Sequence, residues 1–275
     1  MQYVVYEFAT ADEIEQSWLI SLLGDYHFDG FEETTSVLKA YAPASLVNTE
    51  GVRKLLANNE FTHISFIHYQ LEDKNWNEEW EKNFEPVVVA GKVGIRAPFH
   101  AAMNCELELI IEPKMSFGTG HHATTASVIE MMLGMNFAGK SVLDFGSGTG
   151  VLAILAEKLK AAKIVAIDNE EWAFGNCIEN IERNGCVCIT PILGDDNYRF
   201  TEKFDILLAN INRHVILKNL AFWKTLLNSG GELVVSGILL SDEKDIILEA
   251  EKNGLVCVDV IRNNGWLAIR FHEKV

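Results

Sequence analysis

The chain has 275 residues, 48% of them hydrophobic and 23% charged, as in a globular protein with one large core or two unequal ones. A formal net charge of −16 argues against a broad nucleic-acid-binding surface, which needs clustered Lys and Arg, and fits a small-molecule ligand or a basic protein partner better. The N-terminus does not resemble a signal peptide, and no apolar run approaches the roughly 20 residues that span a bilayer. The five scattered cysteines suit a reducing compartment. We therefore expect a cytoplasmic protein that binds no membrane.

The first 72 residues are predicted to form a small α+β domain. Its expected elements are strand, helix, strand, strand, helix and strand, over residues 2–8, 10–23, 30–35, 36–43, 48–58 and 61–70. Thr10, followed three residues later by Glu13, predicts a capping box at the start of the first helix. This order of elements is that of the ferredoxin-like fold.

Residues 73–86 separate this domain from the rest of the chain. Trp76 and Trp80 are four residues apart and so share one helix face, and Pro86 ends the pattern. We therefore predict a short linker helix, with the two tryptophans as packing residues.

Residues 87–275 alternate apolar strands with helices. Strands are expected over residues 87–97, 105–112, 141–145, 163–168, 187–193, 204–211 and 231–238, and helices near 149–160, 170–184, 213–227 and 241–253. Such alternation indicates an α/β domain with a parallel sheet covered on both faces. Asn263-Asn264-Gly265 lies between two further strand-like runs and predicts a hairpin, so the last strand should run antiparallel to its neighbour.

A glycine-rich turn follows the strand at 141–145. Gly146, Gly148 and Gly150 let the backbone pass close to a ligand at the carboxyl edge of the sheet. A dinucleotide fingerprint would hold a pyrophosphate here, but Asp144, two residues before the first glycine, would repel it. The carboxylate suits a ligand with an ammonium group, such as the methionine part of S-adenosylmethionine.

Two further polar residues end strands at the same edge. Asp168 lies 22 residues after Gly146 and could accept hydrogen bonds from both ribose hydroxyls of an adenosine, although NAD enzymes use a carboxylate in the same way. Asn210 could hold an amine through its amide, but a turn residue is an equally good interpretation.

The pattern Asp144-x-Gly146-x-Gly148-x-Gly150, with Asp168 and Asn210, resembles the class I S-adenosylmethionine-dependent methyltransferases. Their fold is a Rossmann-like seven-stranded sheet that ends in an antiparallel hairpin. The segment "SFGTGHHATT", residues 116–125, closely resembles the "AFGTGTHPTT" signature of the PrmA family, which methylates protein eleven of the large ribosomal subunit. The resemblance extends over the whole chain, with a ferredoxin-like recognition domain (1–72), a linker helix (73–86) and a methyltransferase domain (87–275).

This resemblance implies a site and a substrate. The family's cofactor contacts fall on Thr125, Gly146, Asp168 and Asn210, with Phe117 and Gly148 beside them. The implied reaction transfers methyl groups from S-adenosyl-L-methionine to lysine side chains and the N-terminal α-amine of the ribosomal protein, free or in the ribosome.

Two positions bear on this assignment. Ala123 stands where the signature usually has proline. Asn210 is followed by Ile211-Asn212 and not by the Pro-Pro-aromatic sequence of enzymes that methylate amides, which favours an aliphatic amine. The sequence identifies no catalytic base.

Other interpretations remain open from the residues. The same cofactor could serve a small-molecule or nucleic-acid substrate, and the chain could instead be a nicotinamide-dependent oxidoreductase or a module that binds adenosyl ligands. His121 and His122 are adjacent, so their side chains diverge, and no Cys or acidic residue lies at metal-ligand spacing from them; no metal site is therefore predicted. Trp172, Tyr198 and Trp266 are interpreted as packing residues.

Overall fold

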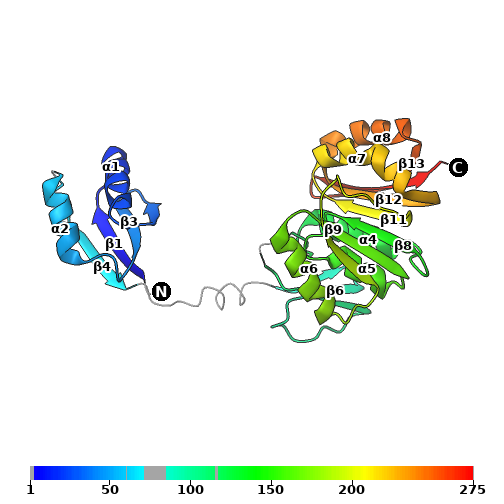
Figure 1. Cartoon of the computed structure of the whole chain (residues 1–275), viewed down its shortest axis with the longest axis horizontal. Helices are drawn as coiled ribbons and strands as arrows, with labels where there is room; N and C mark the ends of the chain where they lie inside the picture. Colours follow the sequence, from blue (N-terminus) through cyan, green and yellow to red (C-terminus); the bar gives the residue numbers. More distant parts are fainter. Residues whose placement is uncertain (1–2, 60, 71–84, 115–116, 275) are drawn as a thin grey trace. The chain divides into compact units, whose positions relative to one another are not determined.

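The computed structural model describes residues 3–59, 61–70, 85–114 and 117–274. The chain forms two compact units, Met1–Asn83 and Phe84–Val275 (Figure 1). The predicted linker helix over residues 73–86 lies, except for its last two residues, outside the described residues.

The smaller unit is a four-stranded antiparallel sheet with two helices. Its elements are β1 (Tyr3–Ala9), α1 (Glu13–Gly24), β2 (Gly30–Glu33), β3 (Val37–Pro43), α2 (Thr49–Asn58) and β4 (Phe66–Gln70). The strand order is β2-β3-β1-β4. Phe8 and Leu38 on one face of the sheet pack with Leu19 of α1 and Val52 of α2, so both helices cover that face.

The cap of α1 differs from the predicted one. Asp12, not Thr10, is the N-cap, and its carboxylate accepts from the backbone N–H groups of Ile14 at 2.8 Å and Glu15 at 3.1 Å. The Thr10 hydroxyl donates to the Glu15 side chain instead, at 2.7 Å. Aspartate and threonine are both good caps, and the helix begins two residues later than the capping box required.

The larger unit contains a mixed sheet and a separate small sheet. Its elements are β5 (Val87–Val89), β6 (Val93–Arg96), β7 (Leu107–Ile110), α4 (Ala123–Leu133), β8 (Ser141–Phe145), α5 (Val151–Lys158), β9 (Lys163–Asp168), α6 (Glu171–Arg183), β10 (Ile189–Leu193), β11 (Phe204–Asn210), α7 (Arg213–Leu226), β12 (Leu227–Leu239), the 3₁₀ turn η1 (Leu240–Asp242), α8 (Glu243–Lys252), β13 (Leu255–Asn263) and β14 (Trp266–Glu273). The large sheet has the order β10-β9-β8-β11-β12-β14-β13. The first five strands are parallel, and β14 runs antiparallel to both of its neighbours. The predicted α/β class and the terminal hairpin are thus confirmed.

Helices cover both faces of the large sheet (Figure 1). Ile129 of α4, Leu155 of α5 and Ile181 of α6 belong to one buried cluster, and Trp223 of α7 and Ile246 of α8 belong to another. Strands buried on both faces have little room for polar side chains, which is why they are nearly continuous apolar runs in the sequence.

The small sheet was predicted incorrectly at one point. Residues 87–97 are not one strand, because a turn at Ala90 (φ 49°) and Gly91 (φ 68°) divides them into the antiparallel pair β5 and β6. Two successive left-handed residues are typical of a type I′ hairpin turn, and alanine is an uncommon first residue there. Strand β7 then pairs parallel to β6.

The order of strands places a crevice at the carboxyl edge of β8. From β8 the chain proceeds to β9 and β10 on one side, and β11 then pairs with the other side of β8. Ligands of open α/β sheets bind outside the carboxyl ends of the strands at such a switch point. The glycine turn after β8, Asp168 at the end of β9 and Asn210 at the end of β11 all lie there.

Candidate active site

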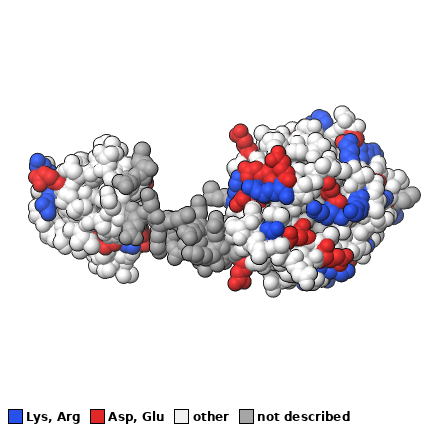
Figure 2. Space-filling view, turned by 90° about the horizontal axis from the view of Figure 1, so that it is seen from below, with Lys and Arg blue, Asp and Glu red and all other residues white. Residues whose placement is uncertain are grey.

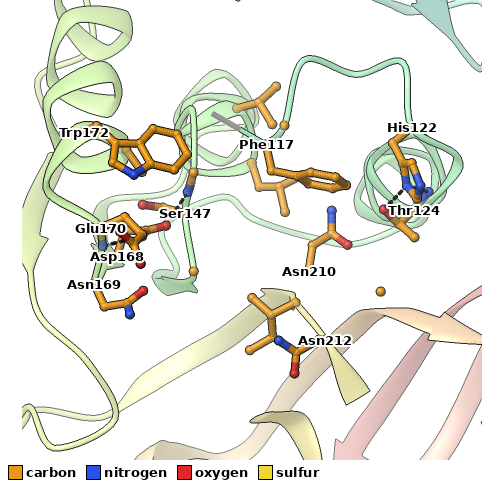
Figure 3. A pocket seen from close by; sticks show the side chains of 18 of the residues that line it. Phe117, His122, Thr124, Ser147, Asp168, Asn169, Glu170, Trp172, Asn210 and Asn212 are labelled. Carbon is orange, nitrogen blue, oxygen red and sulfur yellow. Dashed lines mark hydrogen bonds between the residues drawn. The ribbon is translucent and has the colours of Figure 1, made fainter. Parts of the chain in front are cut away.

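A cavity of about 450 Å³ opens at this edge of the sheet (Figure 3). Asp168, Asn169, Glu170 and Trp172 lie at one end, His122 and Thr124 lie at the other, and Phe117 and Asn210 lie between them. Its remaining lining residues are Gly118, Gly146, Ser147, Gly148, Val151, Leu152, Ala173, Ile211, Asn212, Gly237 and Trp266. The volume is in the range of pockets that hold a small organic ligand.

The glycine turn (residues 146–150) is closely surrounded. Gly146, Gly148 and Gly150 all have positive φ, at 74°, 53° and 79°. A Cβ on Gly146 would lie 2.3 Å from the Ile211 side chain, and one on Gly148 would lie 2.4 Å from the Phe117 carbonyl oxygen. Both conformation and space therefore require glycine here.

The signature loop (residues 117–122) is bonded directly to this turn. The backbone N–H of Thr149 donates to the Phe117 carbonyl at 3.0 Å, and the Thr149 hydroxyl donates to the Gly118 carbonyl at 2.8 Å. Phe117 and Gly118 line the cavity together with Gly146 and Gly148. The loop and the turn thus form one wall of the cavity, although about 30 residues separate them in sequence.

Asp168 is held in place by two backbone N–H groups. Its Oδ2 accepts from Gly148 at 2.8 Å, and its Oδ1 accepts from Glu170 at 3.0 Å. Each carboxylate oxygen keeps a lone pair for a further donor. A partly exposed carboxylate in the cavity, oriented by the glycine turn, can accept from ligand hydroxyl groups.

Asp144 does not have the position expected from the sequence. It is 1% exposed, is not among the residues that line the cavity, and accepts from the Ala153 backbone N–H at 3.1 Å. The N-cap of α5 is Gly150, which has no side chain to cap the helix. Asp144 therefore accepts a hydrogen bond from one of the backbone N–H groups in the first turn of α5 that have no partner within the helix. Burial raises the pKa of Asp144 to about 7, and the charge of Asp168 adds to the rise. Asp144 therefore does not line the cavity, where its carboxylate was expected to suit a ligand ammonium.

Asn210 and Thr125 form a pair in which only Asn210 lines the cavity. The Asn210 amide Nδ2 donates to the Thr125 hydroxyl at 3.1 Å. Thr125 is fully buried in α4, behind Asn210. The Oδ1 atom of Asn210 is buried and has no hydrogen-bond partner among the described residues. A buried acceptor without a partner is costly, so this atom is suited to a donor supplied by a ligand.

An aromatic group forms the end of the cavity near α4. The His122 ring lies 5.1 Å from the Phe117 ring and 4.9 Å from the Trp266 ring, the latter in an edge-to-face arrangement. His122 is also the N-cap of α4, since its Nδ1 accepts from the Thr124 N–H at 3.3 Å. Ala123, which replaces the usual proline, is the first residue of α4, where proline is favoured but not required.

Two residues of the cavity were misread in the sequence. Trp172 and Trp266 were interpreted as packing residues, yet both line the cavity, and Trp172 is 51% exposed. Trp172 follows the carboxyl end of β9 by four residues, so its position in the chain was an available signal. Trp266 reaches the site only through the pairing of β14 with β12, which the sequence does not fix.

Neither a metal site nor a membrane span is found in the parts of the chain that the structure describes. No group of three or more His, Cys, Asp or Glu side chains in those ranges is placed to hold a metal ion. Every helix there is too short or too polar to cross a bilayer.

Solved structures share this fold. The structure of a ribosomal protein L11 methylase from Lactobacillus delbrueckii subsp. bulgaricus matches 70% of this chain and all of its own, with a TM-score of 0.65 and 22% identity. A methyltransferase from Pyrococcus furiosus matches 61% of this chain and 90% of its own, with a TM-score of 0.52 and 21% identity. The fold of the larger unit, with its cavity at the carboxyl edge, is one that methyltransferases share.

Sequence comparison identifies the family. The model of the family described as ribosomal protein L11 methyltransferase (PrmA) matches residues 15–274. A ribosomal protein L11 methyltransferase of Bacteroides fragilis is 40% identical over 98% of this chain and 99% of its own length, and that of Phocaeicola vulgatus is 38% identical over the full length of both. The chain belongs to the ribosomal protein L11 methyltransferase (PrmA) family, which confirms the resemblance found in the sequence.

Proposed function

We propose that the protein transfers methyl groups from S-adenosyl-L-methionine to amines of ribosomal protein L11, free or in the ribosome. The proposed acceptors are lysine side chains and the N-terminal α-amine. The observation that carries this proposal is the buried Oδ1 of Asn210, which has no hydrogen-bond partner among the described residues, on a side chain that lies between the two ends of the cavity. An amine N–H can donate to this oxygen and keep its lone pair directed into the cavity.

The residues present fit the cofactor. We propose that Asp168 accepts from the ribose hydroxyls, because its carboxylate is oriented and partly open. Gly146 and Gly148 line the cavity and carry no side chain, so the ligand can approach their backbone. Phe117 is proposed to cover the ligand, and Thr125 to act through its bond to Asn210.

When bound, the cofactor supplies a sulfonium methyl group that is already activated for direct displacement by a neutral amine. The protein's part is then to align the amine, exclude water and favour the deprotonated form. A lysine has a reference pKa of about 10.4 and an α-amine about 8, so the lysine needs more help. The rings of Phe117, His122 and Trp266 surround the proposed amine position with apolar surface, and desolvation there lowers the pKa of an amine. Asn210 Oδ1 accepts from the amine and holds its orientation.

We further propose that the two units divide the work. Residues 1–72 are proposed to be a ferredoxin-like recognition domain, supported by the strand order β2-β3-β1-β4 with both helices on one face. Residues 73–86 are proposed as a linker helix, and residues 87–275 as a class I methyltransferase domain with its seven-stranded sheet.

A cytoplasmic location without a membrane is proposed, as is an absence of direct nucleic-acid binding. On the face of the larger unit seen in Figure 2, Lys and Arg side chains alternate with Asp and Glu. Pairs such as Lys114–Glu179 at 2.6 Å and Arg183–Glu112 at 3.0 Å neutralise basic groups that phosphates would need.

The test is methyl transfer from labelled S-adenosylmethionine to purified L11 and to ribosomes, followed by mass spectrometry of the modified residues. L11 from cells with and without the gene gives the corresponding comparison in vivo. At saturating S-adenosylmethionine, Asn210→Ala is expected to lower kcat by a hundredfold or more, as is typical for loss of a positioning group at the reaction centre. Transfer to a small molecule or RNA, with none to L11, would refute the proposal.

A further inference from the structure

The acceptor nitrogen loses hydrogen-bond donors with every methyl group that it gains. A neutral primary amine has two N–H groups and a lone pair, a secondary amine has one N–H group, and a tertiary amine has none. In each transfer the lone pair attacks the methyl carbon, the carbon–sulfur bond breaks and its electron pair stays on sulfur. The ammonium product must then give a proton to water before a second cofactor molecule can react. A site that holds an amine through an N–H group therefore cannot hold a dimethylamine in the same way.

The Asn210 amide is fixed so that its oxygen is the atom left for the amine. Its Nδ2 donates to the hydroxyl of Thr125, which is fully buried, at 3.1 Å. Its Oδ1 is buried and has no hydrogen-bond partner among the described residues. This oxygen can accept from an N–H group of a primary or secondary amine. Against a dimethylamine it meets only methyl groups, whose C–H bonds are weak donors.

Phe117, His122 and Trp266, which we call the ring group, line the same cavity. The ring planes of Phe117 and Trp266 are inclined at 59° and 68° to that of His122, so the three rings form separate walls and not one stack. The His122 ring is fixed, because its Nδ1 accepts from the Thr124 backbone N–H at 3.3 Å and lies 2.8 Å from the Thr124 hydroxyl. A backbone N–H can only donate, so a neutral His122 ring carries its proton on Nε2 and has no free lone pair for an amine proton. His122 thus contributes a ring and not a base.

We propose, resting on the proposed function, that the site divides successive transfers between these groups: Asn210 positions primary and secondary amines, and the ring group positions a dimethylamine. Positive charge develops on the nitrogen as the new bond forms. In the first two transfers part of this charge lies on an N–H group, which Asn210 Oδ1 accepts. In the last transfer the charge is spread over methyl groups, and aromatic rings, tryptophan above all, attract methylated ammonium ions. Each contact strengthens as the charge develops, so each lowers the barrier of its own transfers.

The test measures single-turnover methyl transfer to two forms of L11 at saturating S-adenosylmethionine. Unmodified L11 presents primary amines, and L11 after reductive methylation with formaldehyde presents dimethylamines, which keep the positive charge of the protein. Mass spectrometry follows the first methyl group added to the former and the third methyl group on the latter. The full-length wild type is compared with Asn210→Ala and Trp266→Leu. Trp172→Leu is the matched control, because Trp172 lies at the Asp168 end of the cavity, away from His122.

The two variants are expected to show opposite preferences. Asn210→Ala should slow transfer to unmodified L11 about a hundredfold or more but transfer to dimethylated L11 about threefold at most, because a dimethylamine has no N–H group to position. Trp266→Leu keeps an apolar side chain but loses the indole ring, so it should slow transfer to dimethylated L11 about tenfold and the first transfer much less. Trp172→Leu should change both rates by the same factor. Because each variant is compared with itself on two substrates, a general loss of stability or of cofactor affinity cancels.

The outcomes separate this division of roles from the proposed function. Equal factors for the two substrates in Asn210→Ala or in Trp266→Leu would overturn the division and leave the function standing. So would a selective loss in Trp172→Leu, or a wild type that methylates unmodified L11 but not dimethylated L11. A wild type that methylates neither form of L11 would refute the function itself, and the division with it.

Discussion

Asn180 of α6 connects the segment that leads into the signature loop with the glycine turn, and its loss should weaken cofactor binding. Its Oδ1 accepts from the Glu112 backbone N–H at 2.8 Å, and its Nδ2 donates to the Thr149 carbonyl at 3.0 Å. The fully buried side-chain amide of Asn180 therefore links the segment before the signature loop to the glycine turn. Asn184, one helical turn further on, holds Ile110 through both of its backbone groups, at 2.9 and 2.7 Å.

The expected magnitude follows from the two bonds. Asn180→Ala removes the partners of the buried Thr149 carbonyl and of the part-buried Glu112 N–H. A buried polar group without a partner costs about 1–3 kcal/mol, so the variant should lose that much unfolding free energy for the carbonyl and a smaller amount for the N–H. If the ligand must spend only 1.4 kcal/mol of this loss on ordering the signature loop, the Kd for S-adenosylmethionine rises about tenfold.

Calorimetry and urea unfolding measure the two effects. Asn253→Ala is the control, because Asn253, the C-cap of α8, also donates from Nδ2 to a backbone carbonyl, that of Glu249 at 2.7 Å, and no residue of α8 lines the cavity. Asn180→Asp keeps the acceptor for Glu112 but places an oxygen against Thr149, and should be at least as damaging as alanine. Wild-type cofactor affinity in Asn180→Ala would refute the role assigned to this residue.

Three further changes test other parts of the site. Asp168→Asn keeps the size of the side chain but loses the charged acceptor, so calorimetry should show a Kd for S-adenosylmethionine roughly tenfold or more higher; an unchanged Kd would contradict the ribose assignment. Gly148→Ala places a Cβ 2.4 Å from the Phe117 carbonyl oxygen, at a residue with positive φ, so both thermal stability and cofactor affinity should fall. Wild-type values of both would show that the signature loop does not pack tightly against the glycine turn. Burial raises the pKa of Asp144 to about 7, so the folded state binds this proton more tightly than the unfolded state does. The unfolding free energy of the wild type should therefore fall relative to that of Asp144→Asn as the pH rises from about 4 through 7. Urea unfolding across this range measures the difference between the two proteins, and a difference that does not change with pH would contradict the prediction.

Much of the larger unit could be predicted from its sequence because local signals and burial agree there. Strands such as "SVLDF" and "KIVAID" are continuous apolar runs, and a strand buried on both faces permits little else. The glycines of the turn have positive φ and lack room for a Cβ, so their spacing in the sequence directly reflects the backbone. The hairpin before β14 was equally local, since Asn264 and Gly265 supply the two left-handed residues that it needs.

The errors fall where a role depends on contacts between distant segments. Asp144 was expected in the cavity, but the direction of its side chain depends on how α5 packs above β8. Thr125 belongs to the signature, yet only the fold shows that it stands behind Asn210, 85 residues away. The same is true of Asn180, whose bond to Glu112 spans 68 residues and leaves no periodic trace in the chain.

The contacts of Thr149 explain why two glycine-containing segments occur in one chain. Its backbone N–H and hydroxyl bind two successive carbonyls of the signature loop, while its own carbonyl is held by Asn180. The loop therefore cannot move away from the cavity without breaking bonds to the turn on which the ligand is proposed to rest. Ligand binding at the turn and order in the loop are then parts of one equilibrium, so that a ligand with no contact to the loop would still stabilise it.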